Sequence, residues 1–312
     1  MASSTSRPDW SRFTRTGLKA DLYEREPHFR EGLADARDVW GTAFDETLHQ
    51  AALFMVKPEG QVTDGVVRVV RTFLDEQSYE VIAVRNVWLD RLMWREMWRY
   101  QLTSATLDRF AVSDEWLVLG PALLLALRAT RRHELPASVH LTSLKGSATL
   151  ADQQPNTLRS RLRQANRMLS LIHVADEPAD VLRELAVLLD RPERQEVLRR
   201  YLGDEMHPDD KQLLEDATAL PKRSLDPVAA LGRVEKTVLA SGGEMPDVLA
   251  AAFAAMRAGG RIRWAGFASA IDTYRPLIDP WDLVVLGTTH IEYDEPGTSK
   301  LLVNPDPKSW LS

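Results

Sequence analysis

The stretch Ala51-Ala-Leu-Phe-Met-Val56 is a short, continuous apolar run, and Lys57-Pro-Glu-Gly60 follows it directly. An apolar run of this length that ends in a turn containing proline and glycine is typical of a buried strand. The preceding residues, 1–48, are charged and carry scattered aromatic side chains. We therefore expect a folded α+β unit to begin at about residue 49.

Three further strands are expected after this one, each separated from the next by helical spacing or by polar sequence. The predicted strands are 51–56, 80–87, 121–127 and 169–173. The predicted helices are 66–74, 89–102, 139–144 and 176–190, with a polar surface loop over 147–168. The order β-α-β-α-β-α-loop-β-α predicts an α+β sandwich with helices against a small sheet, occupying residues 49–190.

The flanking regions are predicted to be mainly helical. In the N-terminal extension, 1–48, aromatic and apolar residues recur at spacings of three and four, which indicates an amphipathic helix lying on the next domain: Phe29, Leu33, Ala36, Trp40 and Phe44. The C-terminal region, 191–312, is predicted to be a mainly helical domain. Within it, 283–293 and 300–303 are expected to form a hairpin around Pro296-Gly297.

Composition limits the classes of function. Of the 312 residues, 44% are hydrophobic, which is enough for a buried core. The 39 basic and 45 acidic residues give a net charge of −6, which argues against a general nucleic-acid binder. The absence of cysteine excludes disulfides, thiol chemistry and cysteine-bound zinc. The polar start and the short, Gly-Pro-broken run 116–127 predict no membrane segment and a cytoplasmic location.

Two residues are candidates for chemistry before any resemblance is considered. Lys57 stands at a strand end, where its ammonium could contact a phosphate as a point charge; the alternative is a solvated lysine in a loop. His173 ends a predicted strand just before a helix that begins near Asp176, so it could act as a nucleophile or as an acid and base. The alternative for His173 is a packed or surface histidine.

Four blocks, in order along residues 51–190, resemble motifs of the nucleoside diphosphate kinase family. Residues 51–60 resemble its strand-K-P-[DE]-G opening, and 120–127 resemble its G-P third strand. Residues 145–159 resemble G-x-T-N-P-A-D-x-x-P-G-T-I-R, with Asn156 at the glycine position, and 170–177 resemble N-x-x-H-G-S-D-S. Asparagine tolerates the left-handed conformation better than most residues.

The resemblance implies a ferredoxin-like core and a phosphohistidine mechanism. His173 would take the terminal phosphate of a nucleoside triphosphate such as ATP and pass it to a nucleoside diphosphate or a related acceptor. Lys57 would contact the transferring phosphate, Arg159 would hold phosphate oxygens, and Glu184 would orient the histidine ring. Mg²⁺ would be held mainly by the nucleotide phosphates rather than by a carboxylate cage.

The resemblance also assigns nucleotide contacts to Thr149, to Trp98 at the position of a family tyrosine, and to Ser170 at that of an asparagine. Two positions depart from the family pattern: Thr142 replaces an arginine, and Val174 replaces the glycine after the histidine. These losses motivate a second hypothesis, a non-catalytic nucleotide-binding or interaction module.

Other clusters allow two interpretations each. The basic residues of the predicted loop could replace missing cations or form a solvated basic face: Arg161, Arg163 and Arg167. The aromatic residues near Trp98 could stack a base or pack in the core: Trp88, Trp94 and Tyr100. A third functional hypothesis is a specialised pathway enzyme in which 191–312 covers the site. We expect a homodimer, because the terminal additions would block the family's hexameric contacts.

Overall fold

The computed structural model describes residues 9–203, 205–242 and 244–311. Its centre is a four-stranded sheet with the strand order β2-β3-β1-β4, in which every pair of neighbours is antiparallel. The strands are β1 (Ala51–Val56), β2 (Tyr79–Val87), β3 (Ala122–Ala129) and β4 (Ile172–Val174). The α+β class is therefore confirmed at the level of a small antiparallel sheet with many helices.

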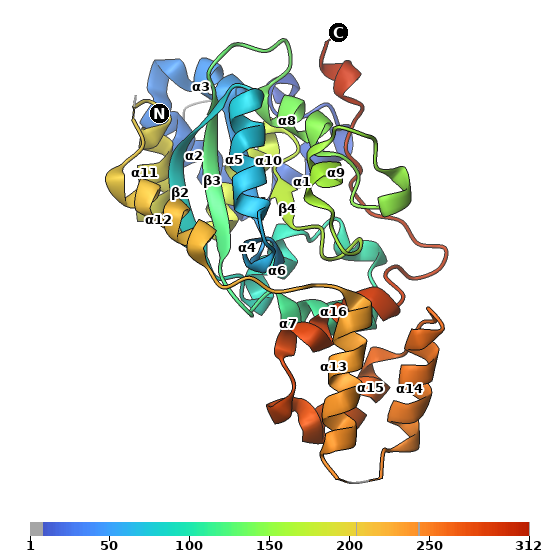
Figure 1. Cartoon of the computed structure of the whole chain (residues 1–312). Helices are drawn as coiled ribbons and strands as arrows, with labels where there is room; N and C mark the ends of the chain where they lie inside the picture. The colour runs from blue at the N-terminus through green and yellow to red at the C-terminus, as the bar shows by residue number, and fades with distance from the viewer. Residues whose placement is uncertain (1–8, 204, 243, 312) are drawn as a thin grey trace.

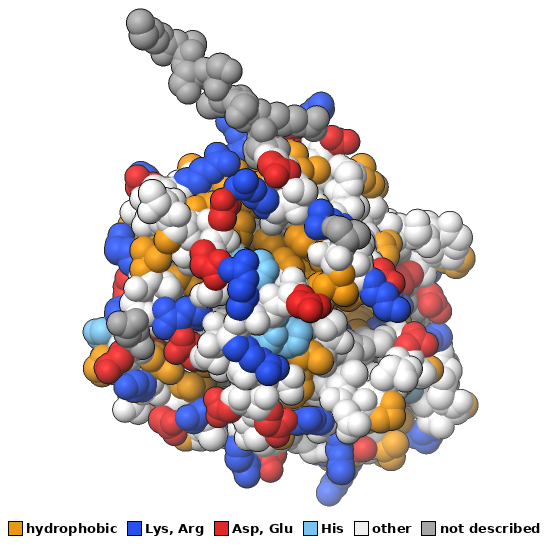
Figure 2. Space-filling view, turned by 90° about the horizontal axis from the view of Figure 1, so that it is seen from above, with side chains coloured by type: hydrophobic (Ala, Val, Ile, Leu, Met, Phe, Trp, Pro, Cys, Tyr) orange, Lys and Arg blue, Asp and Glu red, His pale blue; other side chains and the backbone are white. Residues whose placement is uncertain are grey.

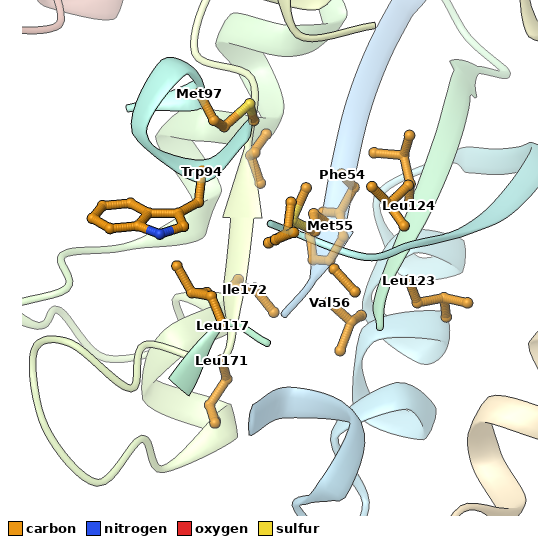
Figure 3. Close-up of a cluster of buried hydrophobic side chains, with 14 of the residues drawn as sticks. Phe54, Met55, Val56, Trp94, Met97, Leu117, Leu123, Leu124, Leu171 and Ile172 are labelled. Atoms are coloured by element: carbon orange, nitrogen blue, oxygen red, sulfur yellow. The ribbon is translucent and has the colours of Figure 1, made fainter. Parts of the chain in front are cut away.

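All residues of β1 are buried, because the strand lies between β3 and β4 in the sheet and helices α8 (Ala137–Lys145) and α10 (Pro178–Leu188) pack against it. Met55 of β1 pairs with Leu124 of β3 and with His173 of β4. Helices cover the faces of the sheet (Figure 1). Figure 3 shows the apolar cluster in which side chains of β1, β3 and β4 meet Trp94 and Met97.

Seven helices connect or follow the strands. They are α4 (Pro58–Val62), α5 (Val66–Glu76), α6 (Arg91–Met97), α7 (Leu107–Trp116), α8 (Ala137–Lys145), α9 (Leu158–Leu162) and α10 (Pro178–Leu188). The predicted helix 89–102 is shorter than expected, since it ends at Met97. The predicted loop 147–168 is wrong in part, because it contains α9, whose Leu158 and Leu162 are buried and which packs against α5.

Within the described residues 9–50, three α-helices precede the sheet: α1 (Gly17–Tyr23), α2 (Pro27–Trp40) and α3 (Phe44–Gln50). The expected amphipathic helix is α2, which packs along α10 and against α11 (Arg191–Arg200). Four of the five residues of the predicted stripe are buried, while Phe44 begins α3 and is partly exposed. This region therefore belongs to the packed structure around the sheet.

Buried ion pairs join these N-terminal helices to α10. The Lys19 ammonium lies 2.7 Å from a carboxylate oxygen of Glu177 and 2.7 Å from one of Asp180. Arg183 donates through Nε to both oxygens of Glu26, at 2.7 Å each. Because all five side chains are buried, these pairs are insulated from solvent, and losing one partner would leave a buried charge.

The remaining helices follow α10 in the chain. They are α11, α12 (Pro208–Ala219), α13 (Pro227–Ala240), α14 (Asp247–Arg257), α15 (Trp264–Ile271) and α16 (Pro280–His290). Helices α11 and α12 lie against α2 and β2, whereas α13 to α16 form a separate group beside α7 (Figure 1). The domain boundaries at 48/49 and 190/191 stay predictions. None of the helices in the described residues is long and apolar enough to cross a membrane.

The hairpin predicted at 283–293 and 300–303 is wrong. The first segment lies mostly in α16, where Asp279 caps the helix by accepting from the backbone N–H of Trp281 at 3.0 Å, and the second segment is not a strand. Residues 281–288 are all buried, between α13 and α7. A helix that is covered on all sides is apolar all round, so its sequence lacks the period that separates a helix from a strand.

Residues 291–304, which we call the C-terminal strap, return from α16 along the sheet region (Figure 1). The backbone N–H of Glu295 donates to Ser104 O at 2.7 Å, and that of Leu301 donates to Tyr100 O at 3.0 Å. Asp294 forms an isolated antiparallel bridge with Ala105. The strap is thus fastened to the segment between α6 and α7.

On the face of the molecule seen in Figure 2, basic and acidic side chains are interspersed.

A pair of stacked histidines lies beside β2. The rings of His133 and His140 are parallel within 20°, with centroids 3.8 Å apart, and Tyr79 Oη lies 2.8 Å from His140 Nδ1. Burial and then the neighbouring His133 lower the pKa of His140 to about 4, against an ordinary value of 6.5. The folded protein therefore favours the neutral ring at His140.

We expect the stack to make stability depend on pH. Between about pH 6.5 and pH 4 the unfolded chain binds a proton at His140 that the folded chain does not, so stability falls as the pH falls through this window. Because the His140 ring is partly exposed, we expect the free energy of unfolding to fall by about 1–2 kcal/mol. This is less than the free energy that corresponds to the whole pKa shift. Urea unfolding of wild type and His140→Gln at pH 7.5 and pH 4.5 measures this; parallel losses in both proteins would contradict it.

Candidate functional site

A pocket of about 510 Å³ opens where β4, the α6–α7 segment, the loop before β4 and the C-terminal strap meet. Its wall contains His173, with basic and acidic side chains on either side. The loop before β4 is anchored to α16, because the Asn166 amide donates to Thr288 Oγ1 at 3.1 Å while its carbonyl oxygen accepts from the backbone of Met168 and Leu169. The C-terminal helices therefore help to place the residues that lead into β4.

His173 lies in β4 and is held by Glu184 of α10. Its Nε2 is 3.0 Å from Glu184 Oε1 and 2.9 Å from Oε2. A carboxylate can only accept here, so Nε2 carries the proton and Nδ1 keeps its lone pair in the neutral ring. Burial raises the pKa of Glu184, and the contact with His173 opposes that shift. The arrangement fixes both the tautomer and the orientation of the imidazole.

Trp98 contacts the other nitrogen of the same ring. Its Nε1 lies 3.4 Å from His173 Nδ1, and the two rings meet edge to face at 86° with centroids 5.6 Å apart. The long distance makes this a weak hydrogen bond that an incoming group can displace. Within the aromatic cluster singled out in the sequence, Trp94 and Trp98 line the pocket, while Trp88 is exposed and Tyr100 lies outside the lining.

Lys57 reaches the pocket but is already paired. Its ammonium lies 2.7 Å from Glu59 Oε1, donates to Met168 O at 3.1 Å, and sits 4.7 Å from the centroid of the Trp116 ring. Burial lowers the pKa of Lys57, and Glu59 opposes this effect. Sequence reasoning named Lys57 and missed its counterion Glu59, which is fully buried two residues away.

Arg159 of α9 lines the same wall. Its Nη1 donates to Gly146 O at 2.7 Å and its Nη2 to Ile172 O at 3.3 Å, while its buried Nε has no partner. Burial lowers the pKa of Arg159 to about 10, so the guanidinium remains charged at neutral pH. Asn156, at the turn before α9, has a φ of 67°, which confirms the expected tolerance for the left-handed conformation.

An acidic residue beside His173 was missed by the sequence interpretation. Asp176 accepts from Lys145 Nζ at 2.7 Å and from Thr142 Oγ1 at 3.3 Å. Although burial raises its pKa, Lys145 and His173 lower it further, so the group is a carboxylate at neutral pH. Thr142, at the position of a family arginine, thus lies at the site but as a partner of Asp176.

Only some of the remaining residues that were predicted to contact the nucleotide line the pocket. Ser170 is buried and lines the pocket, whereas Thr149 does not, its place in the lining being taken by Ser147 and Ala148. Of the three loop arginines, Arg167 alone is in the lining among the described residues. It belongs to a second group of cations, which also contains Arg109 of α7 and Lys300 of the strap. That group was not foreseen, because its members are far apart in the sequence.

Among the residues that the structure describes, no three or more His, Cys, Asp or Glu side chains are arranged to hold a metal ion. The carboxylates that line the pocket have cationic or histidine partners: Asp176 with Lys145, Asp180 with Lys19, and Glu184 with His173. The expectation that Mg²⁺ is held by the nucleotide phosphates stays a prediction.

Comparisons with known proteins give limited similarity. No protein-family model and no curated protein matches the sequence. A halophilic nucleoside diphosphate kinase from Halobacterium salinarum in complex with CDP matches with a TM-score of 0.39 and 20% identity, over 53% of this chain and 97% of that one. A nucleoside diphosphate kinase family protein from Babesia bovis has a TM-score of 0.38 and 16% identity, over 46% and 90%. Likeness at this level leaves the function to be inferred from the geometry of the site.

Proposed function

We propose that this protein is a phosphotransferase in which His173 carries the phosphate between a nucleoside triphosphate and a nucleoside diphosphate or related acceptor. The observation that supports it best is the pair of contacts from Glu184 to His173 Nε2 at 3.0 and 2.9 Å. These contacts leave Nδ1 with its lone pair in a pocket lined by cations. The strand order β2-β3-β1-β4 suits the expected ferredoxin-like core.

In the first half-reaction, the Nδ1 lone pair forms a bond to the terminal phosphorus. The bond from that phosphorus to its bridging oxygen breaks, and the nucleoside diphosphate leaves with the oxygen. The proton stays on Nε2, which continues to donate to Glu184. The carboxylate thereby stabilises the positive charge that develops on the ring. The second half-reaction reverses these steps with an acceptor oxygen, and the lone pair returns to Nδ1.

The surrounding groups have separate parts in this scheme. Arg159, with its unpartnered Nε, would bind oxygens of the transferring phosphate, and the Trp98 N–H would move from Nδ1 to a phosphate oxygen. Lys57 would contribute its charge from beside Glu59. Mg²⁺ bound to the nucleotide phosphates would supply further charge neutralisation.

Labelling tests the proposal directly. Incubation of the full chain with γ-labelled ATP and Mg²⁺ should give a label that is acid-labile and base-stable, as a phosphohistidine is. Addition of a nucleoside diphosphate should remove the label and produce labelled triphosphate. The labelled peptide, identified by mass spectrometry, should contain His173. No label at ample protein and nucleotide, or a label on another peptide, would contradict the proposal.

A second candidate is a module that binds nucleotide without transferring phosphate. The engagement of Lys57 by Glu59 and Met168 O favours it, since a lysine already neutralised gives less help to a transferring phosphate. This candidate predicts saturable binding of nucleotide, measured by calorimetry, together with no label on His173. Labelling at His173 decides between the two.

A further inference from the structure

Three cationic side chains from three separate segments gather on one wall of the pocket. Arg109 comes from α7, Arg167 from the loop before β4, and Lys300 from the C-terminal strap. Asp294 lies between the two arginines, with Oδ1 2.7 Å from Arg109 Nη1 and Oδ2 2.9 Å from Arg167 Nη1. We call this set the strap cluster.

Positive charge is in excess in the strap cluster. Three cations face one carboxylate, and that carboxylate is shared by the two arginines. Lys300 makes no hydrogen bond or ion pair with any residue that the structure describes. Burial lowers the pKa of Arg109, and partial burial together with Arg167 and Arg109 lowers that of Lys300. Like charges held close together, with the two arginine side chains partly shielded from water, favour the binding of an anion.

The cluster is held in place by backbone contacts rather than by side chains alone. Asp294 is fixed by its bridge to Ala105 and by the Ser104 hydroxyl, which donates to Oδ1 at 3.0 Å. On the other side of Lys300, the backbone N–H of Leu301 donates to Tyr100 O at 3.0 Å. Because the backbone segments that carry the cluster are fastened before the ligand arrives, they lose little conformational entropy on binding.

The strap cluster comes from other elements than the groups assigned to the transferred phosphate, although Arg109 is near enough to Lys57 to lower its pKa. Those groups, Lys57 and Arg159, come from the turn after β1 and from α9. We propose that Arg109, Arg167 and Lys300 form a second oxyanion subsite, which binds a phosphate group of the substrate other than the one transferred to His173.

This assignment rests on the proposed function for the identity of the transferred group. The group bound at the strap cluster would be a phosphate that stays with the nucleoside diphosphate after transfer. The assignment also gives the C-terminal strap a direct part in recognising the substrate.

Binding of inorganic tripolyphosphate to the full chain, measured by calorimetry, tests the subsite without any transfer chemistry. Arg167→Gln and Lys300→Gln should each weaken binding about tenfold, since each removes a charge-assisted contact. Arg163→Gln, in the same loop but exposed and outside the pocket lining, and Lys308→Gln, also exposed on the same tail, are the matched controls. Equal affinity in test and control variants would overturn the proposal.

Lys300→Gln separates an effect on binding from an effect on folding. Lys300 has no hydrogen-bond or ion-pair partner among the described residues, so its replacement removes no contact that supports the fold. A second measurement separates the two phosphate positions. Phosphoramidate offers histidine a single phosphoryl group and releases ammonia, so it has no second phosphate for the strap cluster. The rate of labelling from ATP, divided by that from phosphoramidate, should fall about tenfold in Lys300→Gln. An unchanged ratio would overturn the subsite.

The two proposals can fail independently. A wild-type protein that takes no label from either donor contradicts the proposed function, while the tripolyphosphate titration still decides the subsite. A labelled protein with an unchanged ratio contradicts the subsite alone.

Discussion

Replacing His173 by alanine should reduce phosphate transfer from a nucleoside triphosphate by at least roughly 10³-fold, because the atom that forms the bond to phosphorus is lost. No other described histidine is among the residues that line the pocket. The measurement is the initial rate of label transfer to a nucleoside diphosphate, together with the amount of acid-labile label on the protein.

Alanine at this position also leaves Glu184 without its partner, and Glu184 is buried. We expect that loss to cost about 1–3 kcal/mol of stability, so His173→Ala alone cannot separate a chemical effect from a folding effect. The His173→Gln variant separates the two effects, because the glutamine amide can donate to Glu184 but cannot carry a phosphate. The control is His207→Asn, a partly exposed position outside the pocket lining, at which asparagine keeps the helix cap of α12. Transfer that survives in His173→Gln would rule out His173 as the carrier.

Gly60→Ala should destabilise the protein by about 2–3 kcal/mol and disturb the site at the same time. A Cβ at residue 60 would lie 2.4 Å from Leu171 O and 2.8 Å from Val56 Cγ1. The Leu171 carbonyl cannot move away freely, because it accepts from the backbone N–H of Lys57 at 2.9 Å. Leu171 itself has a φ of 65°, in the left-handed region, and stands two residues before His173.

For a chain of this size the expected loss corresponds to a fall of about 3–5 °C in Tm, measured by differential scanning calorimetry. The rate of His173 labelling should fall as well, because the entry to β4 must shift. Gly232→Ala is the matched control: its Cβ would meet nothing within 4 Å, so the change should stabilise α13 by up to about 1 kcal/mol. A Gly60→Ala protein as stable as wild type would contradict this prediction. It would show that the backbone near Leu171 moves away from the added Cβ at little cost.

The sheet could be predicted well because its signals are local. The strand 51–56 matches β1, since a strand buried on both faces appears as an unbroken apolar run. The contact between His173 and Glu184 was expected only through the resemblance, and the structure shows it at 2.9 Å. Thr149 was carried over in the same way, but it lies outside the pocket lining.

What the sequence could not predict depends on distant parts of the chain. The strap cluster joins residues 109, 167, 294 and 300, and nothing in the local sequence of any of them points to the others. The hairpin was predicted wrongly for a different reason. The apolar sequence of α16 fits a strand as well as a helix, and its helical form depends on packing between α13 and α7. Periodicity is informative only where one face of an element meets water.

The buried pairs between the N-terminal helices and α10 also have a consequence for how the chain is made. Lys19 and Asp180 are 161 residues apart, and Glu26 and Arg183 are 157 apart. During synthesis, α1 and α2 leave the ribosome long before their partners exist. At roughly 5–20 residues per second, they wait on the order of ten seconds or more with their apolar stripe uncovered. We expect these helices to be the last part of the sheet region to become ordered on the ribosome.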